Sequence, residues 1–432
     1  MPPLGLYIHV PFCASICSYC NFNRGLFDAG LKDRYVRALR DEIRFVSERV
    51  TAGRHPVTGR PLSDGLPSAF DLGPSAFGLR TSDLGPRTTS PARAADTIYF
   101  GGGTPSLLSP DEIGSLIDTC RSAFALSPDA EVTLEANPET VTVDAMTAYR
   151  SAGVNRVSMG VQSFRDEELR RLGRIHDAAR ARAALDATRA AGIDNVSLDL
   201  MLWLPQQTID ECLFSVRALA ALQPAHASLY LLELYPNAPL KEAMARSGWS
   251  LAPDDDAADM YLRALETLGA AGYEQYEISN FSRPGLACRH NLKYWSDGEW
   301  LAFGCGAHST MDGVRWKNVS ATEMYVRGLE DGGAPVIAER RELTPAERFQ
   351  EAVFMRLRLV AGLDLHEVEQ RYGIDVWERY GDRLARFVEA GLLVREPADG
   401  AAPAGTLRLS PRGLLLSNEV MISFIDAKGT VE

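Results

Sequence analysis

The 432-residue sequence lacks a long hydrophobic run, an excess of basic residues and a second pair of cysteines close to its first three. No stretch approaches the roughly 18–20 consecutive apolar residues that a membrane-spanning helix requires, which excludes such a helix. Acidic residues outnumber basic ones by 57 to 45, giving a net charge of −12, which disfavours broad binding to nucleic acid or anionic membranes. The N-terminus enters a strand pattern without an export signal, so we expect a cytoplasmic protein with reduced cysteines.

Three of the seven cysteines lie in one short segment directly after the first predicted strand. The apolar run at residues 4–10 predicts that strand, Pro11 ends it, and Cys13, Cys17 and Cys20 follow at spacings of four and three. A loop this tight can aim three thiolates at a single point. A four-iron cluster held by three cysteines keeps one iron open to a small molecule, whereas ferredoxin patterns use four cysteines. The spacing therefore favours an iron–sulfur centre with chemistry of its own.

Zinc and disulfide bonds are the alternative uses of these cysteines. A structural zinc site takes four ligands, commonly as two separated pairs, and no second pair follows this loop. His9 is a candidate fourth ligand, although strand alternation points its side chain elsewhere. A disulfide framework is not expected in a chain of this length without a secretory signal. The remaining cysteines are interpreted as buried small hydrophobes, namely Cys120, Cys212, Cys288 and Cys305.

Predicted strands and helices alternate along the first 270 residues. The strands are expected at residues 4–10, 96–100, 131–137, 155–162, 195–201 and 226–234, and the helices at 31–50, 109–124, 142–152, 177–191, from 208 onward and at 255–271. This alternation predicts parallel β/α units with right-handed crossovers. We therefore expect an α/β fold built on a partial (β/α)6 barrel, with a doubly wound open sheet as the alternative.

Polar residues fall at or near the C-terminal ends of these strands. They are the three cysteines, Gly102 to Thr104, Glu135, Gln162, Asp199 and Glu233. Because the active sites of barrel folds lie on that rim, the pattern predicts one shared site. Glu135 or Asp199 taken alone would be interpreted as a solvated carboxylate at a strand end. Glu233 matches no motif and is not included in the predicted site.

Two segments depart from the alternation. Residues 52–94 are rich in Gly, Pro, Ser and Arg and repeat SAFDLGP as SAFGLR and SDLGPR, which predicts a low-complexity, disordered insertion into a core of residues 1–51 and 95–330. Residues 340–432 predict three helices, a two-stranded wing and a terminal helix, a winged-helix-like α+β domain. Such domains often bind DNA, but acidic residues outnumber basic ones here, so we favour a packing or lid role over a nucleic-acid-binding module.

The cysteine segment matches a known motif. The spacing CxxxCxxC, with Tyr19 before the last cysteine, resembles the radical S-adenosylmethionine (SAM) superfamily. The longer string YIHVPFC…CSYCNF resembles the subfamily of oxygen-independent coproporphyrinogen III oxidase and its relative, the heme chaperone HemW. The oxidase carries a further cysteine two residues after the third, where this chain has Phe22. This departure favours the chaperone branch over a decarboxylase acting on coproporphyrinogen III.

The resemblance implies a set of cofactor-binding residues. Cys13, Cys17 and Cys20 would ligate a [4Fe–4S] cluster whose open iron binds the amino and carboxylate groups of SAM. The positions implied to line or hold SAM are Tyr7, Tyr19, Gly102, Gly103, Thr104, Glu135, Gln162, Arg174 and Asp199. The alternative for Arg174 is an ordinary charge on a helix surface. An electron from the cluster would cleave SAM to a 5′-deoxyadenosyl radical, which is chemistry of the cofactor more than of the side chains.

Residues 290–295, HNLKYW, resemble the HNxxYW motif of the heme chaperone branch, in which the histidine is implicated in holding heme. An imidazole is a common axial ligand of heme iron, and Tyr294 and Trp295 could flank the macrocycle. The alternative is that His290 is a hydrogen-bonded loop residue and the aromatics are core, with His308 as the spare ligand candidate. The basic residues that could pair with propionates are Arg283, Arg289 and Lys293. We expect heme or porphyrin as ligand and a heme-accepting protein as partner; the sequence leaves the acceptor and homodimer formation open.

Overall fold

The computed structural model describes residues 2–62, 92–397 and 405–425. Six parallel strands form the centre of its main sheet and follow one another in chain order. They are β1 (Leu4–Val10), β4 (Ala94–Gly102), β5 (Ala125–Ala136), β6 (Arg156–Gln162), β7 (Val196–Leu202) and β8 (His226–Leu231). The predicted partial (β/α)6 barrel is therefore confirmed, and neighbouring strands deliver their C-terminal ends to one rim.

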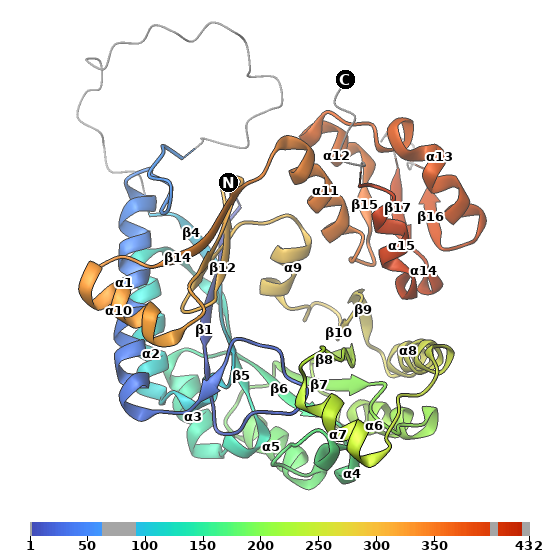
Figure 1. The fold of residues 1–432 in the computed structure, drawn as a ribbon, viewed down its shortest axis with the longest axis horizontal. Coiled ribbons are helices and arrows are strands. Elements are labelled where there is room, and N and C mark those ends of the chain that lie inside the picture. Colours follow the sequence, from blue (N-terminus) through green and yellow to red (C-terminus); the bar gives the residue numbers. More distant parts are fainter. Residues whose placement is uncertain (1, 63–91, 398–404, 426–432) are drawn as a thin grey trace, which may run out of the picture.

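Helices cover the outer side of this curved sheet (Figure 1). They are α1 (Ala29–Thr51), α2 (Pro110–Ala123), α3 (Val143–Ala152), α4 (Asp166–Arg171), α5 (Ala178–Ala190) and α6 (Ile209–Leu222). The capping boxes at Ser109 and Thr208 satisfy the first free amides of α2 and α6. Gly192, with φ of 82°, follows the end of α5, as expected for a residue in the left-handed region.

The sheet continues beyond the six strands at both edges. Beside β1 lie β11 (Trp300–Phe303), β12 (His308–Met311), β13 (Val314–Asn318) and β14 (Ile337–Glu342), and beyond β8 lie β10 (Asn280–Ser282) and β9 (Glu274–Glu277). The connections carry α7 (Pro239–Ser247), α8 (Asp254–Ala270), α9 (Arg289–Trp295) and α10 (Thr322–Gly332). These strands have three to six residues, too few to leave a clear period in the sequence. Figure 1 shows α9 inside the curve of the sheet rather than on its outer side.

The first part of the predicted insertion is ordered. Arg54 and Pro61 form a β-bridge, and Leu62 donates its amide proton to the carbonyl of Gly53 at 2.9 Å. His55 is 1% exposed and its ring meets Trp316 of β13 edge-on, with centroids 5.1 Å apart. The prediction of disorder was therefore wrong for residues 52–62, where one buried aromatic contact outweighs the Gly/Pro-rich composition. At the other end of the predicted insertion, residues 92–94 are also described and Ala94 begins β4, whereas residues 63–91 lie outside the described residues.

The C-terminal domain has its own hydrophobic core. Its helices are α11 (Pro345–Arg356), α12 (Leu365–Tyr372), α13 (Val376–Glu389), α14 (Pro411–Leu415) and α15 (Ser417–Ile422). The predicted two-stranded wing, β16 (Leu393–Glu396) and β17 (Thr406–Leu409), is extended to three strands by β15 (Leu363–Asp364). Residues 398–404 and 426–432 of the predicted domain lie outside the described residues.

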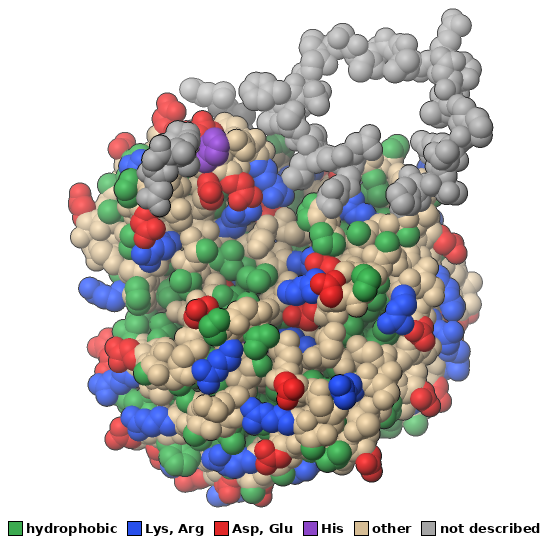
Figure 2. Space-filling model, turned by 180° about the vertical axis from the view of Figure 1, so that it is seen from behind, with side chains coloured by type: hydrophobic (Ala, Val, Ile, Leu, Met, Phe, Trp, Pro, Cys, Tyr) green, Lys and Arg blue, Asp and Glu red, His purple; other side chains and the backbone are tan. Residues whose placement is uncertain are grey.

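Among the described residues, no helix is both long and apolar enough to cross a membrane. Figure 2 shows one face of the molecule, on which Lys and Arg side chains alternate with Asp and Glu side chains. Charges of both signs are thus interspersed over this face.

Candidate functional site

The cysteine loop is tied to the barrel at both ends. β2 (Phe12–Cys13) pairs with β3 (Gly25–Leu26), and the amide of Phe27 donates to the carbonyl of Cys13 at 3.0 Å. His9 does not turn toward the cysteines as a free ligand, because its Nε2 lies 2.7 Å from the carbonyl oxygen of Asn23. The Asn23 side chain in turn donates to the carbonyls of Cys305 and Ser320, each at 3.0 Å. These bonds fix where the loop stands above the ends of β1 and β4.

One pocket of about 370 Å³ collects the cysteine loop and the strand ends. The predicted site residues that line it are Cys13, Cys17, Cys20, Tyr19, Gly102, Gly103, Thr104, Glu135, Gln162, Arg174 and Asp199. This volume falls within the range of small-molecule pockets, roughly 300–1,000 Å³. The structure thus brings these eleven positions together in one pocket. Tyr7 and His290 do not line this pocket.

The glycine run holds β4 against the cysteine loop. A Cβ on Gly103 would lie 2.7 Å from the carbonyl oxygen of Phe12 and 3.0 Å from Sγ of Cys13, so a larger residue would collide with the loop. The amides of Gly103 and Thr104 donate to the carbonyls of Val10 and Phe12 at 2.7 and 2.8 Å. The resemblance implies that Gly102, Gly103 and Thr104 line SAM. In the structure the amides of Gly103 and Thr104 serve the protein itself, and the glycines provide space beside Cys13.

A bulge near the end of β6 directs Gln162 into the pocket. The register with β7 shifts between Gly160 and Gln162, and Gln162 has a φ of 67°, which is unusual for a residue other than glycine. A Cβ on Gly160 would lie 2.8 Å from Nε2 of Gln162, so the absence of a side chain at Gly160 makes room for this amide. Strain of this kind recurs at ligand sites, where the fold maintains it for function.

Arg174 links the cysteine loop to two strands. Its NH1 lies 3.3 Å from Sγ of Cys17, and its NH2 donates to Oδ1 of Asn137 at 2.7 Å and to the carbonyl of Gly160 at 2.9 Å. Burial opposes the charge of Arg174, but Tyr19 and Cys17 favour it more strongly and raise its pKa. Nε is buried without a hydrogen-bond partner among the described residues. The surface-charge alternative for Arg174 is therefore wrong, and one donor remains for a ligand.

Two carboxyl groups face the same pocket. Burial, reinforced by the neighbouring charge of Asp199, raises the pKa of Glu135 to about 7. Glu135 accepts hydrogen bonds from the Tyr99 hydroxyl at 2.8 Å and the Gly102 amide at 3.1 Å. Burial also raises the pKa of Asp199, which accepts from Ser158 at 3.1 Å and Ser197 at 3.0 Å. This pair suits a ligand that carries positive charge or hydroxyl groups, and both properties belong to SAM.

The chemistry of the three cysteines fits an iron–sulfur cluster. All three are free, and Cys13 and Cys20 have pKa values raised mainly by burial and further by the neighbouring thiols. Such thiols become thiolates readily when a cationic iron centre compensates the charge. Among the described residues, no three His, Cys, Asp or Glu side chains are gathered closely enough to hold a single metal ion. Three cysteines at one pocket supply the soft sulfur donors that iron–sulfur clusters use.

Tyr7 and His290 lie outside the pocket, on either side of Tyr99. The ring of His290 is 1% exposed and stacks on Tyr99 with centroids 5.1 Å apart, while Tyr7 stacks on Tyr99 at 6.0 Å. The two imidazole nitrogens of His290 lie 2.8 Å from the hydroxyls of Thr97 and Tyr294. Burial lowers the pKa of His290 to about 3, so the imidazole is neutral. Tyr7 and His290 therefore both pack against the ring of Tyr99, whose hydroxyl group hydrogen-bonds to Glu135.

Several pocket residues escaped the sequence prediction. They are Ser15, Asn21, Arg24, Asn137, Ser158, Met201, Tyr230, Leu232, Glu233 and Tyr235. Glu233 was recognised at a strand end but left out because it matched no motif, and Asn137, next to the end of β5, could have been found by the same rim argument. Ser158 lies in the middle of β6, and only its hydrogen bond to Asp199 on the neighbouring strand β7 indicates that it belongs to the site. Phe22, the residue in place of the oxidase cysteine, stands at the pocket with 68% of its surface exposed.

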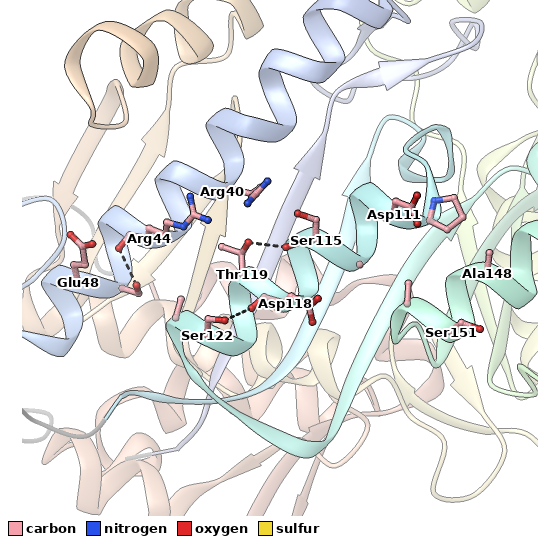
Figure 3. Close-up of a pocket in the computed structure, with 15 residues that line it drawn as sticks. Arg40, Arg44, Glu48, Asp111, Ser115, Asp118, Thr119, Ser122, Ala148 and Ser151 are labelled. Atoms are coloured by element: carbon pink, nitrogen blue, oxygen red, sulfur yellow. Dashed lines mark hydrogen bonds between the residues drawn. The ribbon is translucent and has the colours of Figure 1, made fainter.

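A second, larger hollow of about 1,110 Å³ lies on the outer helix layer between α1, α2 and α3 (Figure 3). Its hydroxyl groups are turned back onto their own helices, since Thr119 donates to the carbonyl of Ser115 at 2.7 Å and Ser122 to that of Asp118 at 2.8 Å. Its lining is mainly polar and charged, including Arg40, Arg44, Glu48, Asp111 and Asp118, whereas small-molecule pockets are mostly apolar with a few placed polar groups. The pocket at the cysteine loop is the candidate functional site.

Comparisons with known proteins agree with the fold and the motifs. The model of the radical SAM superfamily matches residues 89–219, and the model of the HemN C-terminal domain matches residues 343–416. Among solved structures, the coproporphyrinogen III oxidase (HemN) of Escherichia coli is similar over 98% of this chain and 90% of its own, with a TM-score of 0.75 and 23% identity. That likeness concerns the fold.

Similarity in sequence extends over nearly the whole chain. The heme chaperone HemW of Bacillus subtilis is 31% identical over 420 residues, 97% of this chain and 98% of that protein. The Escherichia coli HemW is 35% identical over 83% of this chain and 84% of its own, and the Mycobacterium tuberculosis HemW is 35% identical over 84% and 83%. The chain belongs to the heme chaperone HemW family of the radical SAM superfamily.

Proposed function

We propose that this protein is a heme chaperone that holds a [4Fe–4S] cluster and SAM on the barrel rim and transfers heme to an acceptor protein. The observation that carries the proposal is that three free cysteines line one 370 Å³ pocket together with the four side chains that the resemblance implies hold SAM. These four are Glu135, Gln162, Arg174 and Asp199. Relatives named heme chaperones, similar over nearly the whole chain, support heme as the cargo. The cytoplasmic location stays a prediction from the sequence.

Each group has a role in this proposal. Cys13, Cys17 and Cys20 would hold the cluster, and its open iron would bind SAM, with reductive cleavage to a radical as the chemistry the pair can supply. Arg174 offers its unpaired Nε, and the carboxyl groups of Glu135 and Asp199 offer acceptors. His290 would ligate heme iron in its neutral form, with Tyr294 and Trp295 next to it on α9.

Iron and sulfide analysis after anaerobic reconstitution tests the cluster. Cys13→Ala, Cys17→Ala and Cys20→Ala should each lose most of the cluster, whereas Cys120→Ala and Cys212→Ala, whose thiols are buried in α2 and α6, should keep it. A protein that reconstitutes with zinc alone, or control variants that lose the same amount of iron, would contradict the proposal.

Hemin binding and transfer test the chaperone role. The Soret band of bound hemin should shift or disappear in His290→Ala, and wild-type protein loaded with hemin should pass it to an apo heme protein used as a model acceptor. Incubation with SAM, reductant and coproporphyrinogen III should give no protoporphyrinogen IX, because Phe22 stands in place of the further cysteine. Formation of protoporphyrinogen IX would instead show that the protein is a coproporphyrinogen III oxidase.

A further inference from the structure

Two neighbouring strands bring four polar side chains together on the inner face of the barrel. Residues two apart on a strand face the same side, and the register pairs Ser197 of β7 with His226 of β8, and Asp199 with Ser228. Asp199 lines the rim pocket. Ser197 and His226 lie one step further from the rim and are 0% and 1% exposed. This arrangement connects a carboxyl group of the pocket to a histidine buried in the barrel.

Hydrogen bonds extend this connection to a tyrosine. Nε2 of His226 lies 2.8 Å from the hydroxyl of Tyr276 on β9, and Nδ1 lies 2.8 Å from Oγ of Ser197. The Ser197 hydroxyl donates to Oδ1 of Asp199 at 3.0 Å. The four groups therefore form one continuous chain, from the last strand of the sheet to the pocket.

The number of available protons fixes the direction of this chain. Burial lowers the pKa of His226 well below its usual value, so the imidazole is neutral and carries one proton. Ser197 has a single hydroxyl proton, which points to Asp199 only if His226 donates its own proton from Nδ1 to Oγ. Nε2 then accepts the proton of Tyr276. In the other tautomer, Nδ1 would take the Ser197 proton and Asp199 would lose a donor.

Asp199 depends on such donors because it is poorly solvated. Burial raises the pKa of Asp199, and the hydroxyl groups of Ser228, Ser197 and Ser158 oppose this rise. Each donor that is lost therefore favours the protonated acid. The protonated acid lacks the negative charge that complements the cationic SAM.

We propose that His226 is a positioning residue for SAM, which holds the Ser197 hydroxyl toward Asp199 and so keeps the Asp199 carboxylate available to the ligand. This inference rests on the proposed function, because it concerns the SAM site named there. His226 and Ser197 act through Asp199 rather than by touching the ligand.

Nitrogen-15 NMR of the full-length protein, labelled at its seven histidines, tests the direction of the chain. The signals of His226, assigned by their absence from His226→Asn, should show a protonated Nδ1 and an unprotonated Nε2. A proton on Nε2 would overturn the proposal, because the Ser197 proton would then point to the histidine.

Equilibrium dialysis of labelled SAM against cluster-loaded protein, from pH 6 to 9, tests the effect on the ligand. Ser197→Ala should bind SAM about tenfold more weakly at pH 7, as for the loss of one hydrogen bond to a charged group. The difference from the wild type should widen as the pH falls, because Asp199 takes up its proton at a higher pH. Ser309→Ala is the matched control, since that buried hydroxyl bonds to the backbone of Ala302 on β11.

Other titratable or charged groups also face Asp199. They are Arg156 of β6, Glu135 of β5, Tyr99 of β4 and Tyr230 of β8. Ser197→Ala leaves all four in place, so a shifted pH profile reports the loss of the Ser197 hydroxyl.

Two substitutions of His226 separate hydrogen bonding from packing. The amide nitrogen of His226→Asn stands near the position of Nδ1 and can still donate to Ser197, whereas that of His226→Gln reaches the position of Nε2. Both remove the buried ring, but only His226→Gln should reproduce the SAM profile of Ser197→Ala. Equal losses in the two variants would reduce His226 to a packing role and overturn the proposal.

The wild-type protein distinguishes this inference from the proposed function. If it binds SAM while Ser197→Ala and His226→Gln keep the wild-type profile, the positioning role is wrong and the SAM site survives. A wild-type protein that holds its cluster but binds no SAM overturns both.

Discussion

The hydroxyl of Tyr99 donates a hydrogen bond of 2.8 Å to Oε1 of Glu135, and the same ring stacks on His290 with centroids 5.1 Å apart. Tyr99 therefore touches both the carboxyl group of the rim pocket and the histidine of the HNxxYW motif. The other oxygen of Glu135 accepts the amide proton of Gly102 at 3.1 Å. One half-buried tyrosine thus connects the two halves of the proposed site.

Tyr99→Phe should weaken SAM binding through the protonation of Glu135. Burial raises the pKa of this carboxyl to about 7, and the Tyr99 hydroxyl holds it lower than it would otherwise be. Without that hydroxyl, the pKa of Glu135 rises further. If SAM binding needs the carboxylate, SAM affinity should fall about tenfold near pH 7, and the variant should reach its full affinity about one pH unit higher than the wild type does. Equilibrium dialysis of labelled SAM against cluster-loaded protein from pH 6 to 9 measures both effects.

The control for this experiment is Tyr273→Phe, which removes a buried hydroxyl outside the pocket. Its SAM affinity should follow the wild-type pH profile. Identical profiles for Tyr99→Phe and the wild type would show that Glu135 does not depend on this hydrogen bond.

The parts of the fold that the sequence predicted are those with a clear local signal. The six central strands, the capping boxes at Ser109 and Thr208 and the helices of the C-terminal domain follow from hydrophobic period and cap chemistry. The rim argument located Glu135 and Asp199, because parallel strands bring their ends together whatever the connecting segments are. The cysteine positions needed only their spacing.

The parts that could not be predicted depend on contacts between distant residues. His55 is buried against the ring of Trp316, which lies far away in the sequence, so no local pattern could predict its burial. The bulge that turns Gln162 inward arises from the pairing of β6 with β7. His290 looked like an accessible ligand, but Thr97 and Tyr294 close around it only in the folded barrel.

Arg174→Lys should lower SAM affinity while leaving the cluster in place. The guanidinium contacts Cys17, Asn137 and Gly160 at once, a geometry that the single ammonium of lysine cannot reproduce. We expect affinity to fall about tenfold or more, as for the loss of a charge-assisted hydrogen bond, with unchanged iron content. Arg170→Lys, on the exposed side of α4, is the control and should bind SAM normally. Loss of iron from Arg174→Lys would instead assign this residue to the stability of the cysteine loop.

Glu42→Gln should flatten the pH dependence of stability. Glu42 of α1 is 2% exposed and accepts hydrogen bonds from Gly304, Asn318 and Tyr325, yet burial raises its pKa from 4.5 to about 7. The folded state therefore holds a proton that the unfolded state has already released between these values. Wild-type stability contributed by this group is present below pH 4.5 and is lost as the pH rises to about 7, by on the order of 3 kcal/mol.

Urea unfolding of the cluster-free protein between pH 4.5 and 8 measures this effect. The amide of Glu42→Gln does not titrate, so its free energy of unfolding should vary less over that interval than that of the wild type. Glu48→Gln, on the exposed face of the same helix, should keep the wild-type pH dependence. An equally steep profile in Glu42→Gln would mean that another group causes the slope.

His55→Ala should show that the start of the insertion belongs to the folded core. Nδ1 of His55 accepts the amide protons of Val57 and Thr58, each at 3.2 Å, while the ring packs against Trp316. Removing this 1%-exposed side chain leaves a cavity and two unpaired amides, which should cost about 2–4 kcal/mol in the free energy of unfolding.

Burial lowers the pKa of His55 from 6.5, so the stability from its neutral form is complete above pH 6.5 and is lost as the pH falls below that value. The loss in His55→Ala should accordingly be larger at pH 7.5 than at pH 5. Equal losses at the two pH values would indicate that the histidine ionises in the same way when folded and unfolded, and no loss at all would return residues 52–62 to the status of a dispensable linker.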